Sequence, residues 1–115
     1  MTECEKREAV TIYGASSPLV ARKYKEAAYA LGQAIARAGM DLVSGGGREG
    51  LMAAAITGAL DAGGRAIGVL PGFMVERGWN HPALSEMITV GSMHERKRTM
   101  ASLSRAAVAL PGGCG

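Results

Sequence analysis

The sequence predicts an α/β fold, a Rossmann-like, doubly wound parallel sheet. Five short apolar runs alternate with longer stretches whose apolar residues repeat at helical spacing. Glycine and proline cluster between these segments, which marks the turns that separate strands from helices. Strands that alternate with helices form a parallel sheet with helices on its faces.

The predicted elements follow this alternation along the chain. Short apolar runs predict strands over residues 10–13, 40–44, 66–70, 87–90 and 106–110. Helical periodicity and glycine stops predict helices over residues 18–38, 51–62 and 93–104. The stretch between the third and fourth strands, residues 73–86, is predicted to be irregular.

We expect residues 9–115 to form one domain, preceded by a polar tail over residues 1–8. The chain stops inside a glycine-rich stretch, residues 111–115, directly after a predicted strand. In this fold class such a loop opens the next helix, which covers part of the sheet. We therefore expect a partial Rossmann-like domain, C-terminally incomplete, as in a fragment or an early-terminated product.

Composition and charge narrow the function classes. The net charge of +3 is spread along the chain, without a basic stripe interleaved with aromatic residues, so we expect a phosphorylated small molecule rather than nucleic acid as partner. No apolar run is long enough to span a bilayer, and the polar first residues do not form a signal peptide. Cys4 and Cys114 have neither metal-ligand spacing nor a disulfide framework. We expect a cytoplasmic protein with no metal and no membrane contact.

The first motif is a glycine loop between the second predicted strand and its helix. Gly45, Gly47 and Gly50 match G-x-G-x-x-G, and such a loop lets backbone N–H groups and a helix N-terminus approach an anion. The alternative is that these glycines serve only close helix–strand packing. A bound NAD is rejected, because the motif follows the second strand and no acidic residue ends the third.

The second motif lies on the last predicted helix. Arg96 shares one helical face with Met93, Met100 and Leu103, and Lys97 lies at the edge of that face. A guanidinium on an apolar face needs a partner, and its forked donors suit phosphate or carboxylate. The alternative is an arginine whose stem packs while its head reaches water.

Other polar side chains carry less information. His81 and His94 lack metal spacing, and we interpret each as a surface or packing residue. Ser16 suits phosphate binding, but helix capping explains it about as well.

Taken together, four segments resemble the Lonely Guy (LOG) family of cytokinin riboside 5′-monophosphate phosphoribohydrolases. These segments are Gly14-Ala15-Ser16-Ser17, Gly45-Gly46-Gly47 with Gly50-Leu51-Met52, Met93-His94-Glu95-Arg96-Lys97 and Pro111-Gly112-Gly113-Cys114-Gly115. The resemblance implies hydrolysis of the N-glycosidic bond of N6-substituted adenosine 5′-monophosphates, or of AMP, to the free base and ribose 5-phosphate. It also implies a homodimer that needs no cofactor.

The resemblance assigns roles to individual residues. It implies that Arg96 is catalytic and that Lys97, Gly113, Cys114 and Gly115 bind substrate. Ser16 and the loop of Gly45, Gly46 and Gly47 would line the same pocket.

The family's nucleotide loop continues as Gly-Thr-x-Glu-Glu, and this sequence stops at Gly115. We therefore expect the 115-residue chain by itself to have little or no activity. The alternative function is a carrier that binds a nucleotide or molybdenum cofactor without cleaving it.

Overall fold

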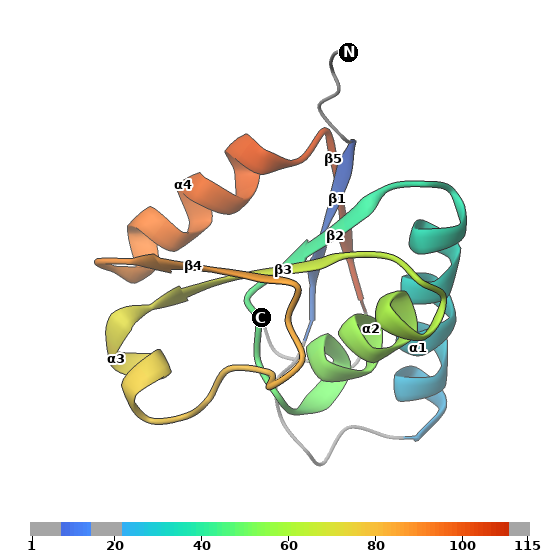
Figure 1. The fold of residues 1–115 in the computed structure, drawn as a ribbon, viewed down its shortest axis with the longest axis horizontal. Helices are drawn as coiled ribbons and strands as arrows, with labels where there is room; N and C mark the ends of the chain where they lie inside the picture. The colour runs from blue at the N-terminus through green and yellow to red at the C-terminus, as the bar shows by residue number, and fades with distance from the viewer. Residues whose placement is uncertain (1–7, 15–21, 111–115) are drawn as a thin grey trace.

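A computed structural model describes residues 8–14 and 22–110 of the chain (Figure 1). The strands are β1 Ala9–Tyr13, β2 Asp41–Ser44, β3 Ala66–Pro71, β4 Glu86–Val90 and β5 Ala106–Ala109. The helices are α1 Arg22–Arg37, α2 Gly50–Asp61, α3 Gly72–Glu76 and α4 Met93–Leu103.

The five strands form one parallel sheet in the order β4-β3-β2-β1-β5. From β1 the chain moves outward through β2, β3 and β4, and then returns to place β5 on the other side of β1. The strand order therefore reverses between β1 and β5. In doubly wound sheets ligands bind outside the carboxyl ends of the strands at this reversal.

Helices cover both faces of the sheet, as the sequence predicted (Figure 1). Leu42 joins an apolar cluster with residues of α1 and α2, whereas its neighbour Val43 joins a second cluster with Met100 of α4. Alternate residues of a strand point to opposite faces, so one buried strand supports both layers. Thr11 of β1 also anchors α4, because its hydroxyl donates to the carbonyl of Met100 at 3.2 Å.

The layer of α1 and α2 depends on two glycines at the helix contact. A Cβ on Gly32 would lie 2.1 Å from the carbonyl oxygen of Ala55, and one on Gly58 would lie 2.1 Å from that of Tyr29. The two backbones are thus closer than any side chain permits, and each glycine faces the other helix.

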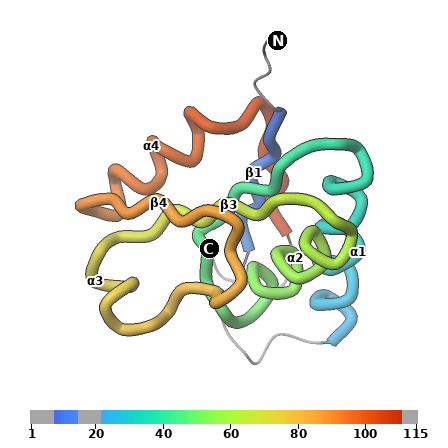
Figure 2. Tube along the Cα trace, viewed as in Figure 1, coloured from blue at the N-terminus to red at the C-terminus, as the bar shows by residue number. Residues whose placement is uncertain are grey.

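The segment 73–86 is more ordered than the sequence predicted. It contains most of α3, and β4 begins inside it at Glu86. Pro71 adopts φ −63° and precedes this short helix, and Gly78 follows it with φ +73°. One helical turn between a proline and a glycine shows little periodicity, which is why the pattern missed it. Figure 2 shows α3 apart from α1 and α2, beyond the end of β3.

The side chains of Ala106, Ala107 and Ala109 on β5 are exposed, so this edge strand is little covered by the described residues.

On α4 only Met100 of the expected apolar face is buried, while Met93 and Leu103 are 43% and 37% exposed. The buried face is therefore narrower than predicted, because only the middle of α4 lies over the apolar cluster that contains Val43 and Met100.

None of the described helices is long and apolar enough to cross a membrane.

We predict that Gly32→Ala lowers the free energy of unfolding by about 1–3 kcal/mol, because overpacking forces the two helices apart. Urea unfolding followed by circular dichroism measures this change. The control is Gly72→Ala, where the added Cβ meets only the Thr89 methyl at 3.7 Å. Equal stabilities for the two variants would contradict the close contact between the helices.

Candidate functional site

Helix α4 begins with a reciprocal cap that fixes the position of its first turn. The hydroxyl of Ser92 accepts a hydrogen bond from the backbone N–H of Glu95 at 3.1 Å. The carboxylate of Glu95 in turn accepts from the N–H of Gly91 at 2.8 Å. This arrangement is close to a capping box. Glu95 is therefore a structural residue of the helix start, and it lines neither of the two cavities described below.

Arg96 follows directly and reaches across the carboxyl ends of two strands. Its Nε donates to the carbonyl oxygen of Val69 in β3 at 2.8 Å, and its Nη2 donates to that of Gly45 after β2 at 2.5 Å. Nη1 contacts the sulfur of Met93 at 3.7 Å. A Cβ on Gly45 would lie 2.2 Å from Nη2, so a glycine there leaves room for the guanidinium. Arg96 thus points inward, as the helical face predicted.

The charge of Arg96 is not neutralised within residues 8–14 and 22–110. The ion pairs found there join Arg65 to Asp41 and Glu86, and Arg105 to Glu8. Burial lowers the pKa of Arg96 from its ordinary value, because desolvation disfavours the charged form. Two carbonyls satisfy two N–H groups but supply no negative charge. The remaining donors are suited to an anionic ligand.

A cavity of about 600 Å³ lies where the strand order reverses. We call it the switch-point cavity. It is bounded by the ends of β1, β2 and β5 and by α4, and its lining includes Gly14, Gly45, Arg96, Lys97 and Leu110. Both cations come from α4, and no acidic side chain is found among its described lining residues.

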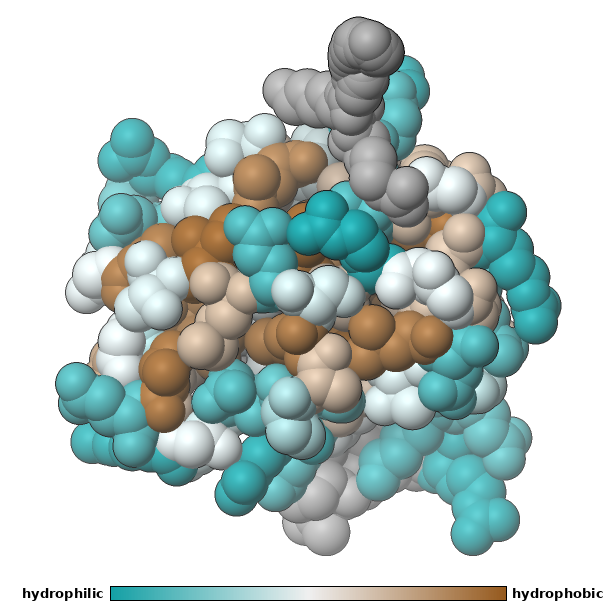
Figure 3. Space-filling model, in the orientation of Figure 1, coloured by the Kyte–Doolittle hydropathy of each residue, from teal (hydrophilic) through white to brown (hydrophobic). Residues whose placement is uncertain are grey.

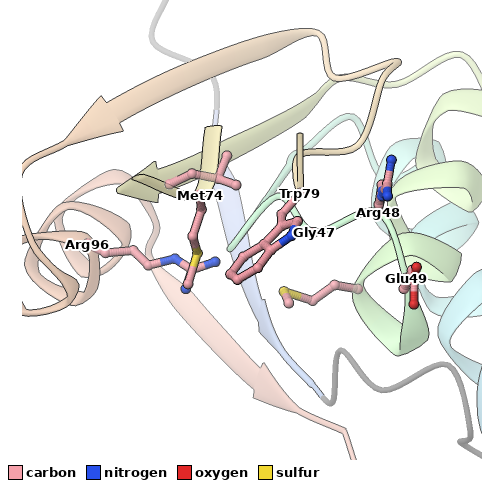
Figure 4. A pocket seen from close by; sticks show the side chains of 8 residues that line it. Gly47, Arg48, Glu49, Met74, Trp79 and Arg96 are labelled. Atoms are coloured by element: carbon pink, nitrogen blue, oxygen red, sulfur yellow. The ribbon is translucent and has the colours of Figure 1, made fainter. Parts of the chain in front are cut away.

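A second cavity of about 320 Å³ adjoins the ends of β2 and β3. We call it the tryptophan cavity, because the indole of Trp79 enters it. Figure 4 shows Arg96 reaching in from α4, with Met74 and Trp79 beside its guanidinium and with Arg48 and Glu49 at the far end. Arg96 and Met52 line both cavities. The guanidinium therefore lies at their common boundary.

Hydrogen bonds and close packing with surrounding residues hold the glycine loop in place. The N–H of Gly46 donates to the Ser44 hydroxyl at 3.0 Å, and its carbonyl accepts from the N–H of His81 at 2.7 Å. Gly46 has φ +73°, and a Cβ there would lie 2.6 Å from Leu70 and 3.0 Å from the backbone of Gly68. Close packing thus explains Gly46, whose N–H already has a partner, whereas Gly45 and Gly47 line the cavities.

An isolated β-bridge and a backbone hydrogen bond join this loop to the segment that carries Trp79. Gly47 forms an antiparallel bridge with Asn80, and the N–H of Arg48 donates to the carbonyl of Trp79 at 3.1 Å. His81 strengthens the connection, because its Nδ1 accepts from the N–H of Ala83 at 3.0 Å and its Nε2 lies 3.3 Å from the Thr57 hydroxyl. His81 is thus a packing residue, as expected. Burial lowers the pKa of its imidazole from the ordinary value of 6.5.

Some of the predicted site residues meet in the structure and others lie outside the described residues. Gly45, Arg96 and Lys97 line the switch-point cavity, and Gly47 lines the tryptophan cavity. Ser16, Gly113, Cys114 and Gly115 lie outside the described residues. Within the described ranges, no group of three or more His, Cys, Asp or Glu side chains could hold a metal ion.

Trp79 and Met74 were not predicted as cavity residues, because they fall in the segment expected to be irregular. One signal was available. Trp79 is the chain's single tryptophan, and a lone large aromatic in a loop beside a glycine motif deserved weight as a ligand contact.

Comparison with known proteins supplies a family. Residues 7–115 match the model of the SLOG cluster4 family. The chain is 42% identical over 109 residues to a cytokinin riboside 5′-monophosphate phosphoribohydrolase of Rhodococcoides fascians. The aligned residues make up 94% of this chain and 55% of the relative. It is also 42% identical over 106 residues to a probable enzyme of the same name from Oryza sativa subsp. japonica, covering 92% of this chain and 43% of the relative. The chain thus spans about half the length of the curated relatives it matches.

Two solved structures with the same fold are described as molybdenum cofactor proteins rather than as phosphoribohydrolases. A molybdenum cofactor carrier protein from Chlamydomonas reinhardtii matches with a TM-score of 0.80 and 32% identity, over 95% of this chain and 64% of that one. A molybdenum cofactor binding protein from Rippkaea orientalis matches with a TM-score of 0.82 and 27% identity, over 97% and 66%.

The geometry of His81 predicts that acid weakens the fold. Since its pKa is lowered in the folded chain, the unfolded chain binds the proton more readily below about pH 6.5, and the free energy of unfolding falls as the pH drops through the folded pKa. Protonation also removes the Nδ1 acceptor for Ala83.

In His81→Asn the amide oxygen replaces Nδ1 as an acceptor but does not titrate. Urea unfolding at about pH 7.5 and about pH 5 should show a smaller acid loss in this variant than in the wild type. Equal losses would show that His81 does not contribute to the pH dependence.

Proposed function

This chain belongs to the SLOG cluster4 family, and we propose that it forms the nucleoside 5′-monophosphate pocket of an N-glycosyl hydrolase. The proposed reaction cleaves adenosine 5′-monophosphates, including those substituted at N6, into the free base and ribose 5-phosphate. The name of the Rhodococcoides fascians relative supports this reaction, as does the resemblance of the chain's motifs to the LOG family.

The observation that carries the proposal is the place of Arg96 between two cavities. The switch-point cavity has two cations and no acidic side chain among its described lining residues, which suits a phosphate. The tryptophan cavity has an apolar wall and an indole, which suits a flat base. A nucleotide that occupies both would place the bond between base and sugar beside Arg96, the residue shared by the two cavities.

Arg96 would act on the departing base. When the N-glycosidic bond breaks, the electron pair stays on the base and positive charge develops on the ribose. A guanidinium held by two carbonyls is already oriented, and hydrogen bonds from it to the base stabilise the negative charge as it forms. We propose that Lys97, which lines the switch-point cavity, contacts the phosphate. A carboxylate beside the ribose would stabilise this positive charge. Glu95 does not supply it, since its side chain caps α4.

The second candidate function is a carrier that binds its nucleotide or molybdenum cofactor intact. The two solved structures with TM-scores of 0.80 and 0.82 favour it. A carrier needs the same phosphate pocket, but it does not need a guanidinium beside the N-glycosidic bond. The place of Arg96 therefore favours the hydrolase.

We also propose that the protein is a cytoplasmic homodimer. Apolar side chains lie along β4 and α4 on the face shown in Figure 3, and Met87, Met93 and Leu103 are 37–43% exposed. Exposed apolar side chains gathered beside a ligand site are typical of an interface. The two cysteines give no disulfide framework, which is typical of a protein in a reducing compartment.

We predict that Arg96→Ala weakens AMP binding to this chain about tenfold or more, since a charge-assisted hydrogen bond contributes about 1.5–3 kcal/mol. Arg96→Lys should not restore affinity, because an ammonium group cannot span the carbonyls of Val69 and Gly45. Isothermal titration calorimetry measures both effects. Arg98→Ala is the control, as Arg98 is exposed on the same helix and lines neither cavity.

Turnover is tested in a chimera that carries residues 7–115 of this chain in place of the matched part of the Rhodococcoides fascians relative. Adenine released from AMP, and abolished by Arg96→Lys, would support the hydrolase. Intact AMP recovered from a chimera that binds it would support the carrier. Absence of AMP binding to both proteins would refute the proposed pocket.

The dimer proposal predicts that Met87→Glu shifts the protein from dimer to monomer, because a carboxylate in an apolar interface loses its hydration. Sedimentation velocity at several concentrations measures this shift. Glu76→Ala, an exposed change on α3, should leave the dimer intact. A wild-type protein that sediments as a monomer at all concentrations would end the proposal.

A further inference from the structure

We propose that Met93 is a site of reversible oxidation, and that its sulfoxide lowers the affinity of the switch-point cavity for an anionic ligand. This inference rests on the proposed function, because it takes the ligand to be a nucleotide whose phosphate is held by Arg96. It goes further by assigning to the site a redox-sensitive group that the hydrolysis reaction does not use.

The three nitrogens of the Arg96 guanidinium have different partners. Nε donates to the carbonyl of Val69 at 2.8 Å and Nη2 donates to that of Gly45 at 2.5 Å, so backbone oxygens engage two of the three. Nη1 contacts the sulfur of Met93 at 3.7 Å. A thioether is only a weak acceptor. Nη1 is therefore the nitrogen that an anionic ligand uses most readily, and Met93 is its neighbour.

Met93 is accessible as well as close to the guanidinium. It is the first residue of α4, it lines the switch-point cavity, and it is 43% exposed. Oxidation needs contact between the sulfur and the oxidant. Hydrogen peroxide is small enough to reach a sulfur through the cavity, even where the outer face of α4 meets a second copy of the chain.

The methionines compared here differ in exposure and position. Met100 also lines the switch-point cavity, but it is buried. Met52 lines the same cavity and is half-buried. Met87 is 41% exposed, but it lines neither cavity. Met93 therefore combines the exposure of Met87 with a place in the cavity.

The oxidation is a two-electron transfer of oxygen from a peroxide. The O–O bond of hydrogen peroxide breaks and an S–O bond forms at Met93, so the sulfur is oxidised to the sulfoxide and the peroxide is reduced to water. The sulfoxide is polar, and methionine sulfoxide reductases reverse the step. Since the sulfur already lies 3.7 Å from Nη1, rotation of the side chain brings the added oxygen within hydrogen-bonding distance of that nitrogen.

The sulfoxide oxygen competes with the ligand for Arg96. It accepts a hydrogen bond from the nitrogen that the two carbonyls leave open, and its partial negative charge faces the place proposed for the phosphate. Both effects disfavour an anion, which depends on charge-assisted hydrogen bonds from the guanidinium. The bonds to Val69 and Gly45 still hold the arginine in place. Oxidation therefore weakens binding while the site stays folded.

The test measures AMP binding to the 115-residue chain before and after treatment with hydrogen peroxide. Isothermal titration calorimetry should give a dissociation constant about tenfold higher for the oxidised chain, as expected for the loss of one charge-assisted hydrogen bond. Mass spectrometry with peptide sequencing measures the sulfoxide at Met93 and at Met87 separately. Treatment with methionine sulfoxide reductases for both epimers should return the constant to its original value.

Two substitutions at Met93 determine whether the added oxygen is responsible. Met93→Leu has no sulfur to oxidise, so peroxide should change its dissociation constant by less than about twofold. Met93→Gln carries a carbonyl oxygen near the place of the sulfoxide oxygen, and without peroxide it should bind AMP about tenfold more weakly than Met93→Leu does. Circular dichroism confirms that each variant is folded.

The matched control is Met87→Leu. It removes a sulfur of similar exposure that lines neither cavity, so the AMP affinity of this variant should respond to peroxide as that of the wild type does.

The outcomes distinguish this inference from the proposed function. If the untreated chain binds AMP and full oxidation of Met93 leaves the dissociation constant unchanged, the oxidation site is refuted as a regulator while the nucleotide pocket stands. The same holds if peroxide weakens Met93→Leu as much as the wild type. If the untreated chain does not bind AMP, both proposals fail. A loss of affinity that requires Met93 and that the reductases reverse would support the inference.

Discussion

The hydrogen bonds from Arg96 to the carbonyls of Val69 and Gly45 hold the candidate site together. A guanidinium taken partly out of water loses hydration, and the two backbone oxygens replace some of it. They do so at the carboxyl ends of neighbouring strands, so the side chain cannot rotate away without losing both bonds. The charge is thereby held at the boundary of two cavities, where a ligand can use it.

This arrangement depends on backbone positions that only glycine permits. Gly45 leaves room for the guanidinium, and Gly46 lies against Gly68 of β3 at a distance that no larger residue allows. On the other face of the sheet, Gly32 and Gly58 bring α1 and α2 together. The clustered glycines are therefore required mainly by packing, and the site forms where that packing leaves backbone and cavity side by side.

One fold supports both hydrolase-named and carrier-named relatives of this chain. A shared sheet would place the proposed phosphate pocket at the same edge in both, because ligands of doubly wound sheets bind where the strand order reverses. Cleavage demands more, since charge that forms in the transition state must meet a group already oriented toward it. The distinction between the two functions therefore lies in side chains such as Arg96 rather than in the fold.

The alternation of apolar runs with amphipathic stretches was enough to predict a parallel, doubly wound sheet. Local chemistry decides where strands and helices begin, so the predicted bounds agree with the structure to within a few residues for β1, β2, β3 and β4. The inward direction of Arg96 was also predictable, because helical periodicity places it on the same face as Met100. The family resemblance added a role for this residue, and the match over residues 7–115 confirmed the family.

Tertiary structure alone decided which partners these residues meet. Arg96 and Gly45 are separated by 51 positions in the sequence, and no local pattern encodes that contact. The same holds for Trp79, whose place beside the glycine loop follows from pairing between Gly47 and Asn80. Sequence periodicity specifies the direction of a side chain relative to its own helix or strand, whereas a cavity arises only where several such elements end together.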